Sequence, residues 1–131
     1  MRRPRRPVSA ARRVRVVLIT APTRTAALRI GRALVRERLA ACVNCVPGIT
    51  SIFRWQGRVD TAHETLLVVK TTARRLPALA AAVRRLHTYD LPEVLALAAA
   101  GGSAAYARWV LRSCAALRNT GKKELFLRKR F

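Results

Sequence analysis

The order of β-forming and helix-forming segments is the feature that most constrains this chain of 131 residues. A β-branched run at residues 14–20 is followed by an amphipathic segment that begins after Pro22. Two adjacent β-forming segments come next, at residues 42–55 and 64–72. A second amphipathic segment, at residues 75–87, then leads to a short apolar run at 91–98. This order predicts strand, helix, strand, strand, helix, strand.

The first amphipathic segment has the signals of a helix with one buried face. Thr23 or Thr25 provides an N-cap. Two sets of residues recur at helical spacing on opposite sides, an apolar face (Ala27, Ile30, Gly31, Leu34) and an arginine face (Arg29, Arg32, Arg36).

The remaining segments have equally clear boundaries. Pro47-Gly48 predicts a bend or bulge inside the long strand 42–55, and Gly57 centres a turn over residues 56–60, so that 42–55 and 64–72 form a hairpin. Gly101-Gly102 ends the last strand. Ser103 then caps a terminal helix, whose predicted apolar side carries Tyr106, Val110, Cys114 and Leu117.

A β-α-β-β-α-β order with a terminal helix predicts an α+β fold of the ferredoxin-like, split βαβ type, in which two helices cover one face of a four-stranded sheet. The other face of that sheet stays open in a single chain. Because it carries valine, isoleucine, leucine and tryptophan, we expect self-association or an added element to cover it.

Basic charge is concentrated at both ends of a chain whose net charge is +21. Residues 1–13 contain six arginines and no acid, and residues 118–131 contain six basic residues and one acid. We expect two basic, disordered tails that flank one domain over residues 14–117. The N-terminal tail also has the composition of a transit peptide. Tails of this kind bind polyanions non-specifically, so a nucleic-acid-associated protein is an alternative function.

Sequence-specific RNA recognition is poorly supported, although RNA-recognition domains share this strand order. Those domains stack bases on aromatic residues of the central strands, and residues 14–20 and 64–72 contain none. No apolar run approaches the roughly 20 residues of a membrane span, so we expect no membrane partner.

Cys42 and Cys45 have the C-x-x-C spacing of redox dithiols and zinc sites. In a strand, however, residues three apart point to opposite faces of the sheet. A redox dithiol also needs a helix N-terminus, and a zinc site needs a second ligand pair, which the sequence lacks. We therefore expect at least one of these cysteines to be a small buried side chain.

His87 lies in a polar cluster between the second helix and the last strand, together with Tyr89, Asp90 and Glu93. Connections of this kind often carry function because a rigid scaffold positions them. The alternative is a histidine that only interacts with carbonyl groups at a helix end. The residues alone do not decide between the two, and they contain no recognisable nucleophile–base set.

Five segments of the chain resemble the CutA family of divalent-cation tolerance proteins in order and spacing. They are VVLITAP (16–22), ERLAACVNCVPGITSIFRWQG (37–57), LLVVKTT (66–72), LHTYDLPEVLAL (86–97) and AYARWV (105–110). The family's characteristic positions are matched at Cys42, Trp55, Lys70, His87, Tyr89, Pro92 and Glu93.

The resemblance implies a cytoplasmic homotrimer that binds divalent metal ions, copper in preference to zinc, and acts as a metal-responsive binding protein rather than an enzyme. It implies a metal site at Cys42, His87 and Glu93. It further implies an intersubunit cleft lined by Trp55, Lys70 and Tyr89, where a small ligand or signalling molecule is the alternative occupant. A cysteine or histidine with a carboxylate suits copper or zinc.

Two departures from the family pattern are specific to this chain. Arg24 stands where the family usually has an acidic pair, and Thr88 replaces the proline of its usual His-Pro-Tyr. Thr88 leaves the backbone before Tyr89 less restricted, because proline would have fixed φ.

Overall fold

The computed structural model describes residues 2–3 and 9–116. The elements along the chain are η1 (a 3-10 helix, Ala10–Arg13), β1 (Val14–Ala21), α1 (Arg24–Arg36), β2 (Cys42–Trp55), β3 (Arg58–Thr72), α2 (Leu76–Leu86), β4 (Leu95–Ala98) and α3 (Ala104–Ser113).

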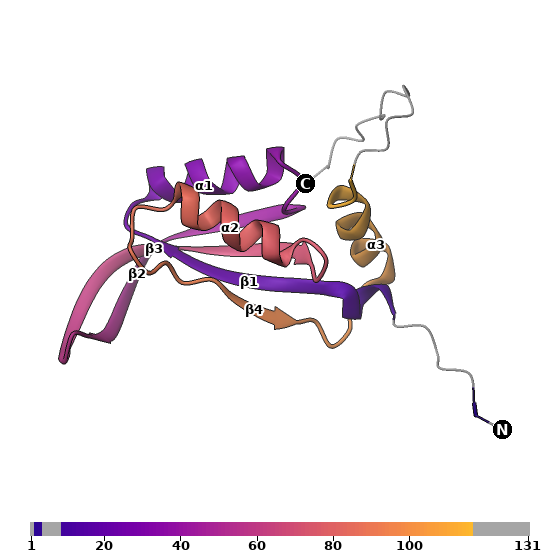
Figure 1. Cartoon of the computed structure of the whole chain (residues 1–131), viewed down its shortest axis with the longest axis horizontal. Coiled ribbons are helices and arrows are strands. Elements are labelled where there is room, and N and C mark those ends of the chain that lie inside the picture. Colours follow the sequence, from indigo (N-terminus) through magenta and orange to yellow (C-terminus); the bar gives the residue numbers. More distant parts are fainter. Residues whose placement is uncertain (1, 4–8, 117–131) are drawn as a thin grey trace.

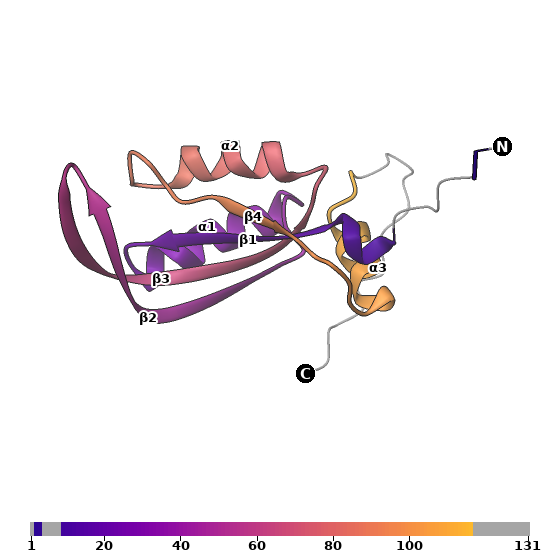
Figure 2. The same ribbon diagram turned by 90° about the horizontal axis from the view of Figure 1, so that it is seen from below.

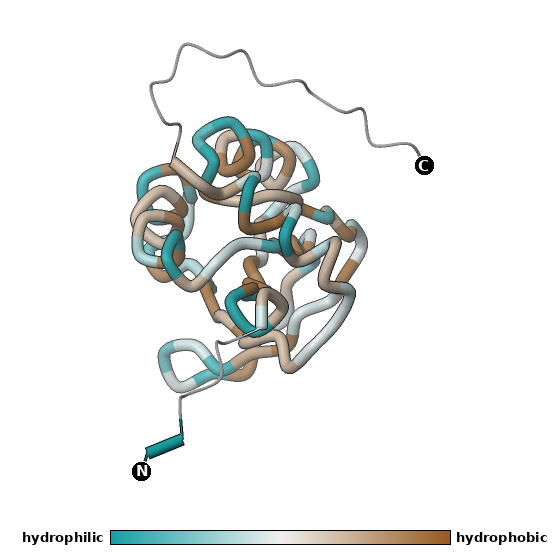
Figure 3. Tube along the Cα trace, turned by 90° about the vertical axis from the view of Figure 1, so that its right-hand side faces the viewer, coloured by the Kyte–Doolittle hydropathy of each residue, from teal (hydrophilic) through white to brown (hydrophobic). Residues whose placement is uncertain are grey.

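The four strands form one antiparallel sheet in the order β2-β3-β1-β4. Helices α1 and α2 lie side by side on one face of it, and α3 lies at the end where β1 begins (Figures 1 and 2). The mixed α+β fold with the predicted split βαβ order is confirmed. Hydrophilic and hydrophobic residues alternate along the helices (Figure 3), as expected for helices with one buried face.

The main core lies between the sheet and the helices α1 and α2. Alternate residues of the central strands supply one side of it, and apolar residues at helical spacing supply the other: Val17, Ile19, Leu67 and Val69 from the strands, and Ile30, Leu34, Leu79 and Val83 from the helices. Each is at most 1% exposed, and full burial of such a side chain contributes roughly 1.5–3 kcal/mol.

Helix α1 begins at the predicted cap. The hydroxyl of Thr23 accepts a hydrogen bond from the backbone N–H of Ala26 at 3.0 Å. The predicted apolar face of the helix is buried and its arginines are exposed. Gly31 allows close approach to β2, because a Cβ atom there would lie 3.1 Å from Cγ1 of Val43.

The β2–β3 hairpin is longer than β1 and extends past the helices (Figure 1). The predicted bulge is present, since the β2–β3 register shifts between Val46 and Ile49. The predicted turn over residues 56–60 is too long. The turn consists of Gln56 and Gly57, both with positive φ, and β3 already begins at Arg58. This two-residue turn matches the right-handed twist of the strands, so pairing continues to the tip.

The last strand and last helix differ from prediction. β4 begins at Leu95 rather than at residue 91, because Pro92 has no backbone N–H for a ladder. Tyr106, predicted to be on the apolar side of the terminal helix, is 39% exposed, and Ala107 is buried in its place. Helix α3 packs through Ala107, Val110 and Cys114. Leu117 lies outside the described residues.

Part of the N-terminal tail expected over residues 1–13 and all of the C-terminal tail expected over 118–131 lie outside the described residues. Ala10–Arg13, which fall within the expected N-terminal tail, form η1. Ala11 of η1 and Val14 of β1 are buried against α3 in a second, smaller apolar cluster. The folded part of the chain therefore begins at least four residues before the predicted boundary.

Candidate functional site

The sheet face opposite α1 and α2, hereafter the open face, is apolar in its middle and polar at one side. Strand register places its residues in rows across the sheet: Leu97, Val16, Lys70 and Cys42; Leu95, Leu18, Val68 and Asn44; and Thr20, Leu66 and Val46. Leu95 is 56% exposed, Leu97 50% and Val46 42%. A single chain therefore leaves a continuous aliphatic surface in contact with water.

Cys42 and Cys45 lie on opposite faces of the sheet, as the alternation of side chains predicts. Cys42 is on the open face, opposite Lys70. Cys45 packs against the main core, and burial raises the pKa of its thiol, while Arg24 and Arg32 lower it to a smaller extent. The two thiols therefore do not form a dithiol site, and only Cys42 of the two lies on the open face.

Asn44 connects the polar residues of the open face. Its side-chain oxygen accepts a hydrogen bond from Nζ of Lys70 and a weaker one from Sγ of Cys42, at 3.9 Å. Reasoning from the sequence missed Asn44. Its signal was its position two residues after Cys42, which places both on one face of a strand.

His87 lies at the C-terminal end of α2, where it is 9% exposed. The backbone N–H of Tyr89 donates to its Nδ1 at 3.1 Å, so Nδ1 carries no proton. Nε2 is therefore the protonated nitrogen and donates to the carbonyl oxygen of Thr20 at 2.7 Å. Because both ring nitrogens are engaged, His87 ties the end of β1 to the α2–β4 loop and presents no free nitrogen to a metal.

Tyr89 extends this cluster to β3. Its hydroxyl donates to a carboxylate oxygen of Glu64 at 2.9 Å, and its ring lies 4.6 Å from that of His87. Burial, the hydrogen bond to Glu64 and the negative charge of Glu64, in decreasing order, together raise the pKa of Tyr89 to about 12. Reasoning from the sequence did not connect Glu64 with Tyr89, and a carboxylate at the start of an apolar strand was the only signal for it.

The six predicted site residues fall into three separate places within one chain. Cys42 and Lys70 are opposite each other near one end of β3, whereas Tyr89 contacts Glu64, six residues earlier on that strand, or roughly 20 Å away. Trp55 lies farther out, beside the turn at the tip of the hairpin.

Glu93 is exposed in the α2–β4 loop, on the His87 side. The described residues contain no group of three or more histidine, cysteine or acidic side chains able to hold a metal ion. The predicted site at Cys42, His87 and Glu93 therefore cannot form within one described chain.

The raised pKa of Tyr89 predicts an unusual titration. In Tyr106→Phe, which leaves Tyr89 as the single tyrosine, we expect the tyrosinate ultraviolet absorbance to appear near pH 12 rather than near 10. Since the unfolded chain ionises first, the stabilisation from this shift is present below pH 10 and lost between pH 10 and 12. Adding Glu64→Gln should lower the midpoint, whereas Glu93→Gln should leave it unchanged. A midpoint near 10 in Tyr106→Phe would contradict the buried Tyr89–Glu64 contact.

Comparison with known proteins identifies the family of this chain. Residues 15–113 match the family model CutA1, which describes the CutA1 divalent ion tolerance protein. This chain belongs to the CutA1 family. The expectation from the five sequence segments is confirmed, since the matched range contains all five of them.

Two relatives and one solved structure illustrate the match. The "Divalent-cation tolerance protein CutA" of Thermus thermophilus is 54% identical over 95 residues, which cover 72% of this chain and 92% of that protein. The "Protein CutA, chloroplastic" of Arabidopsis thaliana is 45% identical over 98 residues, or 75% of this chain and 54% of that protein. The chain thus spans about half the length of this plant relative.

The crystal structure of CutA1 from Oryza sativa superposes on this chain with a TM-score of 0.76 at 43% identity, covering 80% of this chain and 96% of the other. The CutA1 family match therefore extends from the sequence to the whole described fold. Among the described residues, no helix is long and apolar enough to cross a membrane.

Proposed function

We propose that this chain acts in divalent-cation tolerance as a homotrimer that binds divalent metal ions, copper in preference to zinc, between its subunits. The observation that carries the proposal is the open face, with the exposed aliphatic residues of β2 and β4 at its two edges. Membership of a family named for divalent ion tolerance supports the metal. We also propose a cytoplasmic location.

Self-association has two supports in the fold. Contiguous apolar surface of this kind is a hallmark of an interface. The edges of the sheet differ, since one is the long β2 and the other the short β4. Contact between unlike edges is a head-to-tail arrangement, which closes into a ring when the rotation allows. Phe53 and Trp55, exposed side chains of the hairpin that the register places on the open face, extend the contact surface.

A metal site between subunits follows from the separation of its candidate ligands within one chain. Cys42 is partly exposed on the open face and supplies a soft sulfur ligand, which suits copper. Glu93 supplies an exposed carboxylate from the α2–β4 loop, whose Tyr89 contacts the middle of β3. We assign His87 the role of holding that loop in place, since its ring nitrogens already have partners. Assembly is then the event that brings Cys42 and Glu93 of different chains together.

The test is a calorimetric titration of Cu²⁺ and Zn²⁺ into the wild type, Cys42→Ser and the matched control Cys45→Ser. Loss of even an indirect contact to a metal typically lowers affinity 10–100-fold, so we expect Cys42→Ser to weaken Cu²⁺ binding by at least about tenfold. Cys45→Ser should bind as the wild type does, because Cys45 lies on the helix-covered face. Equal losses in both variants, or none in Cys42→Ser, would remove Cys42 from the site.

A small-ligand or signalling role is the second candidate, and Lys70 favours it. Lys70 is a cation on the open face beside Asn44, where an anionic ligand between subunits would find a charged partner. Lys70→Gln separates the two functions. If the site binds metal through Cys42, Lys70→Gln should leave the Cu²⁺ affinity unchanged. If Lys70→Gln loses only the binding of a small anion, the small-ligand role gains support.

A further inference from the structure

The outer side of α1 is a row of arginines with no acid among them. Four arginines, Arg24, Arg29, Arg32 and Arg36, project from this helix, which contains no aspartate or glutamate, and we call them the α1 arginine face. All four are exposed. The neighbouring α2 adds Arg84 and Arg85 and also lacks acids. The layer formed by α1 and α2 is therefore strongly basic even without the charge of the two ends of the chain.

Little of this charge is used inside the protein. Arg29 donates to the carbonyl oxygen of Leu86 at 3.0 Å, and Glu37, just after α1, pairs with Arg85 at 3.1 Å. The side chains of Arg24, Arg32 and Arg36 make no hydrogen bond or ion pair with any other described residue. Like charges three or four residues apart destabilise a helix by a few tenths of a kcal/mol each. Repulsion within the α1 arginine face thus slightly lowers the stability of the helix. Its guanidinium groups are available to bind an external anion.

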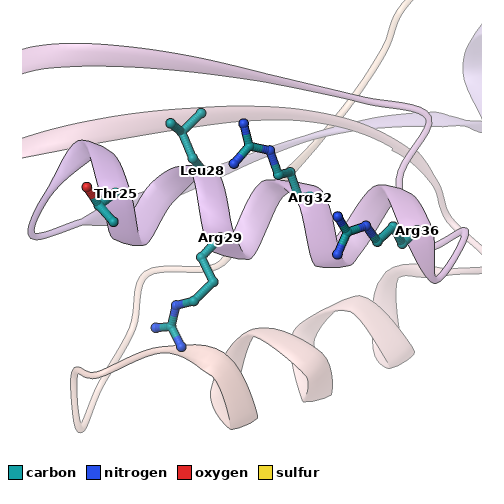
Figure 4. Close-up of a pocket in the computed structure, with 5 residues that line it drawn as sticks. All are labelled: Thr25, Leu28, Arg29, Arg32 and Arg36. Carbon is teal, nitrogen blue, oxygen red and sulfur yellow. The ribbon is translucent and has the colours of Figure 1, made fainter.

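Three of the four arginines border a shallow depression. A depression of about 340 Å³ is lined by Thr25, Leu28, Arg29, Arg32 and Arg36. Figure 4 shows Arg29 directed toward α2, and Leu28 and Arg32 directed away from it. Guanidinium groups form paired hydrogen bonds with phosphate oxygens, so these divergent arginines suit successive phosphate groups rather than one bound ion.

We propose that the α1 arginine face binds the phosphate backbone of duplex nucleic acid without sequence specificity. Single-stranded nucleic acid is bound by stacking on aromatic side chains, and neither α1 nor α2 contains one. A membrane surface is bound by inserting large apolar side chains, and Val35 is the one exposed large apolar residue of α1. Four arginines on one helix without aromatic neighbours match backbone phosphates, which position a duplex and carry no sequence information.

This site is distinct from the proposed metal site. The α1 arginine face lies on the helical layer, on the opposite side of the sheet from Cys42 and the rest of the open face (Figure 1). Self-association through the open face leaves the arginines accessible. It would also present several copies of them on one particle, which raises the avidity for a long duplex.

The experiment measures binding of a fluorescent mixed-sequence DNA duplex by anisotropy at several salt concentrations, using full-length chains. The test variant is Arg24→Gln/Arg32→Gln/Arg36→Gln, which leaves the Arg29–Leu86 contact in place. The matched control is Arg12→Gln/Arg108→Gln/Arg112→Gln, in which three exposed arginines at the α3 end are removed for the same change in charge. A lysine version, Arg24→Lys/Arg32→Lys/Arg36→Lys, keeps the charge.

Each lost phosphate contact reduces the slope of log K against log salt by about 0.9. We therefore expect the test variant to reduce the slope by about 2–3 and to bind at least about tenfold more weakly near 100 mM salt. The control should change the slope by less than about 1, and the lysine version should retain most of it. Circular dichroism of each variant verifies that the fold is kept.

Three outcomes would overturn the proposal. Equal losses in the test and control variants would show that net charge alone attracts the duplex. Unchanged binding in the test variant, with loss in Arg118→Gln/Arg128→Gln/Arg130→Gln, would assign the contact to the C-terminal segment. Loss of binding to phosphatidylglycerol vesicles in the test variant, with DNA binding intact, would assign the α1 arginine face to a membrane surface.

Discussion

Val68→Arg is expected to convert the proposed trimer into monomers of 14.6 kDa. Val68 lies in the middle of the open face, between Leu18 on β1 and Asn44 on β2. An arginine there would carry its charge into an apolar contact between subunits. Transferring an unpaired charge out of water costs several kcal/mol, and the cost recurs in every copy of the interface.

The matched control is Val35→Arg, which makes the same chemical change on the outer side of α1, where the valine is 42% exposed. Light scattering at micromolar concentration should give three times the chain mass for the wild type and for Val35→Arg. It should give one chain mass for Val68→Arg, with its circular dichroism retained, because position 68 borders solvent in the single chain. A wild-type monomer, or a Val68→Arg protein that keeps the wild-type mass, would contradict assembly through the open face.

His87→Ala is expected to lower the free energy of unfolding by about 2–3 kcal/mol. The imidazole makes two hydrogen bonds in a site that is 9% exposed, one with the carbonyl of Thr20 and one with the N–H of Tyr89. Each is worth roughly 1 kcal/mol, and the side chain leaves a cavity when it is removed. The loss also frees the α2–β4 loop that carries Glu93.

The other histidine of the chain provides the control. His63 is exposed on the hairpin and lies 3.5 Å from the hydroxyl of Thr50, so His63→Ala should change the free energy of unfolding by less than about 0.5 kcal/mol. Urea denaturation at one fixed protein concentration compares the variants, since assembly makes stability concentration-dependent. Equal stability of the two variants would contradict a structural role for His87. It would return its ring nitrogens to the set of candidate metal ligands.

Features set by short-range periodicity were predictable from the sequence. The buried face of α1, the Thr23 cap and the bulge after Val46 all depend on residues within a few positions of one another. The opposite placement of Cys42 and Cys45 has the same origin, because the two-residue period of a strand does not depend on the partner strand. Local rules failed where two patterns overlapped, as at residues 91–94, where an apolar run contains a proline.

The arrangement of the candidate site was not predictable in this way. Tyr89 meets Glu64 across 25 positions of the chain, and His87 meets Thr20 across 67. Both contacts depend on where the end of α2 comes to rest against β1 and β3. The cluster at His87 was found as a group of polar residues, but whether its histidine was structural or free was left open. The hydrogen bonds to both ring nitrogens assign it a structural role within the chain.

The element order, the two-layer fold, the family and the charge of the helical layer were all predictable from the sequence, because each follows from local period, composition or ordered motifs. Only the tertiary structure decided which of those residues lie together. The strand register sets Cys42 opposite Lys70 and leaves Tyr89 and His87 near Glu64, in the middle of β3. The physical reason is that an extended strand separates residues by about 3.3 Å each, so six positions along β3 are enough to divide one predicted site into two.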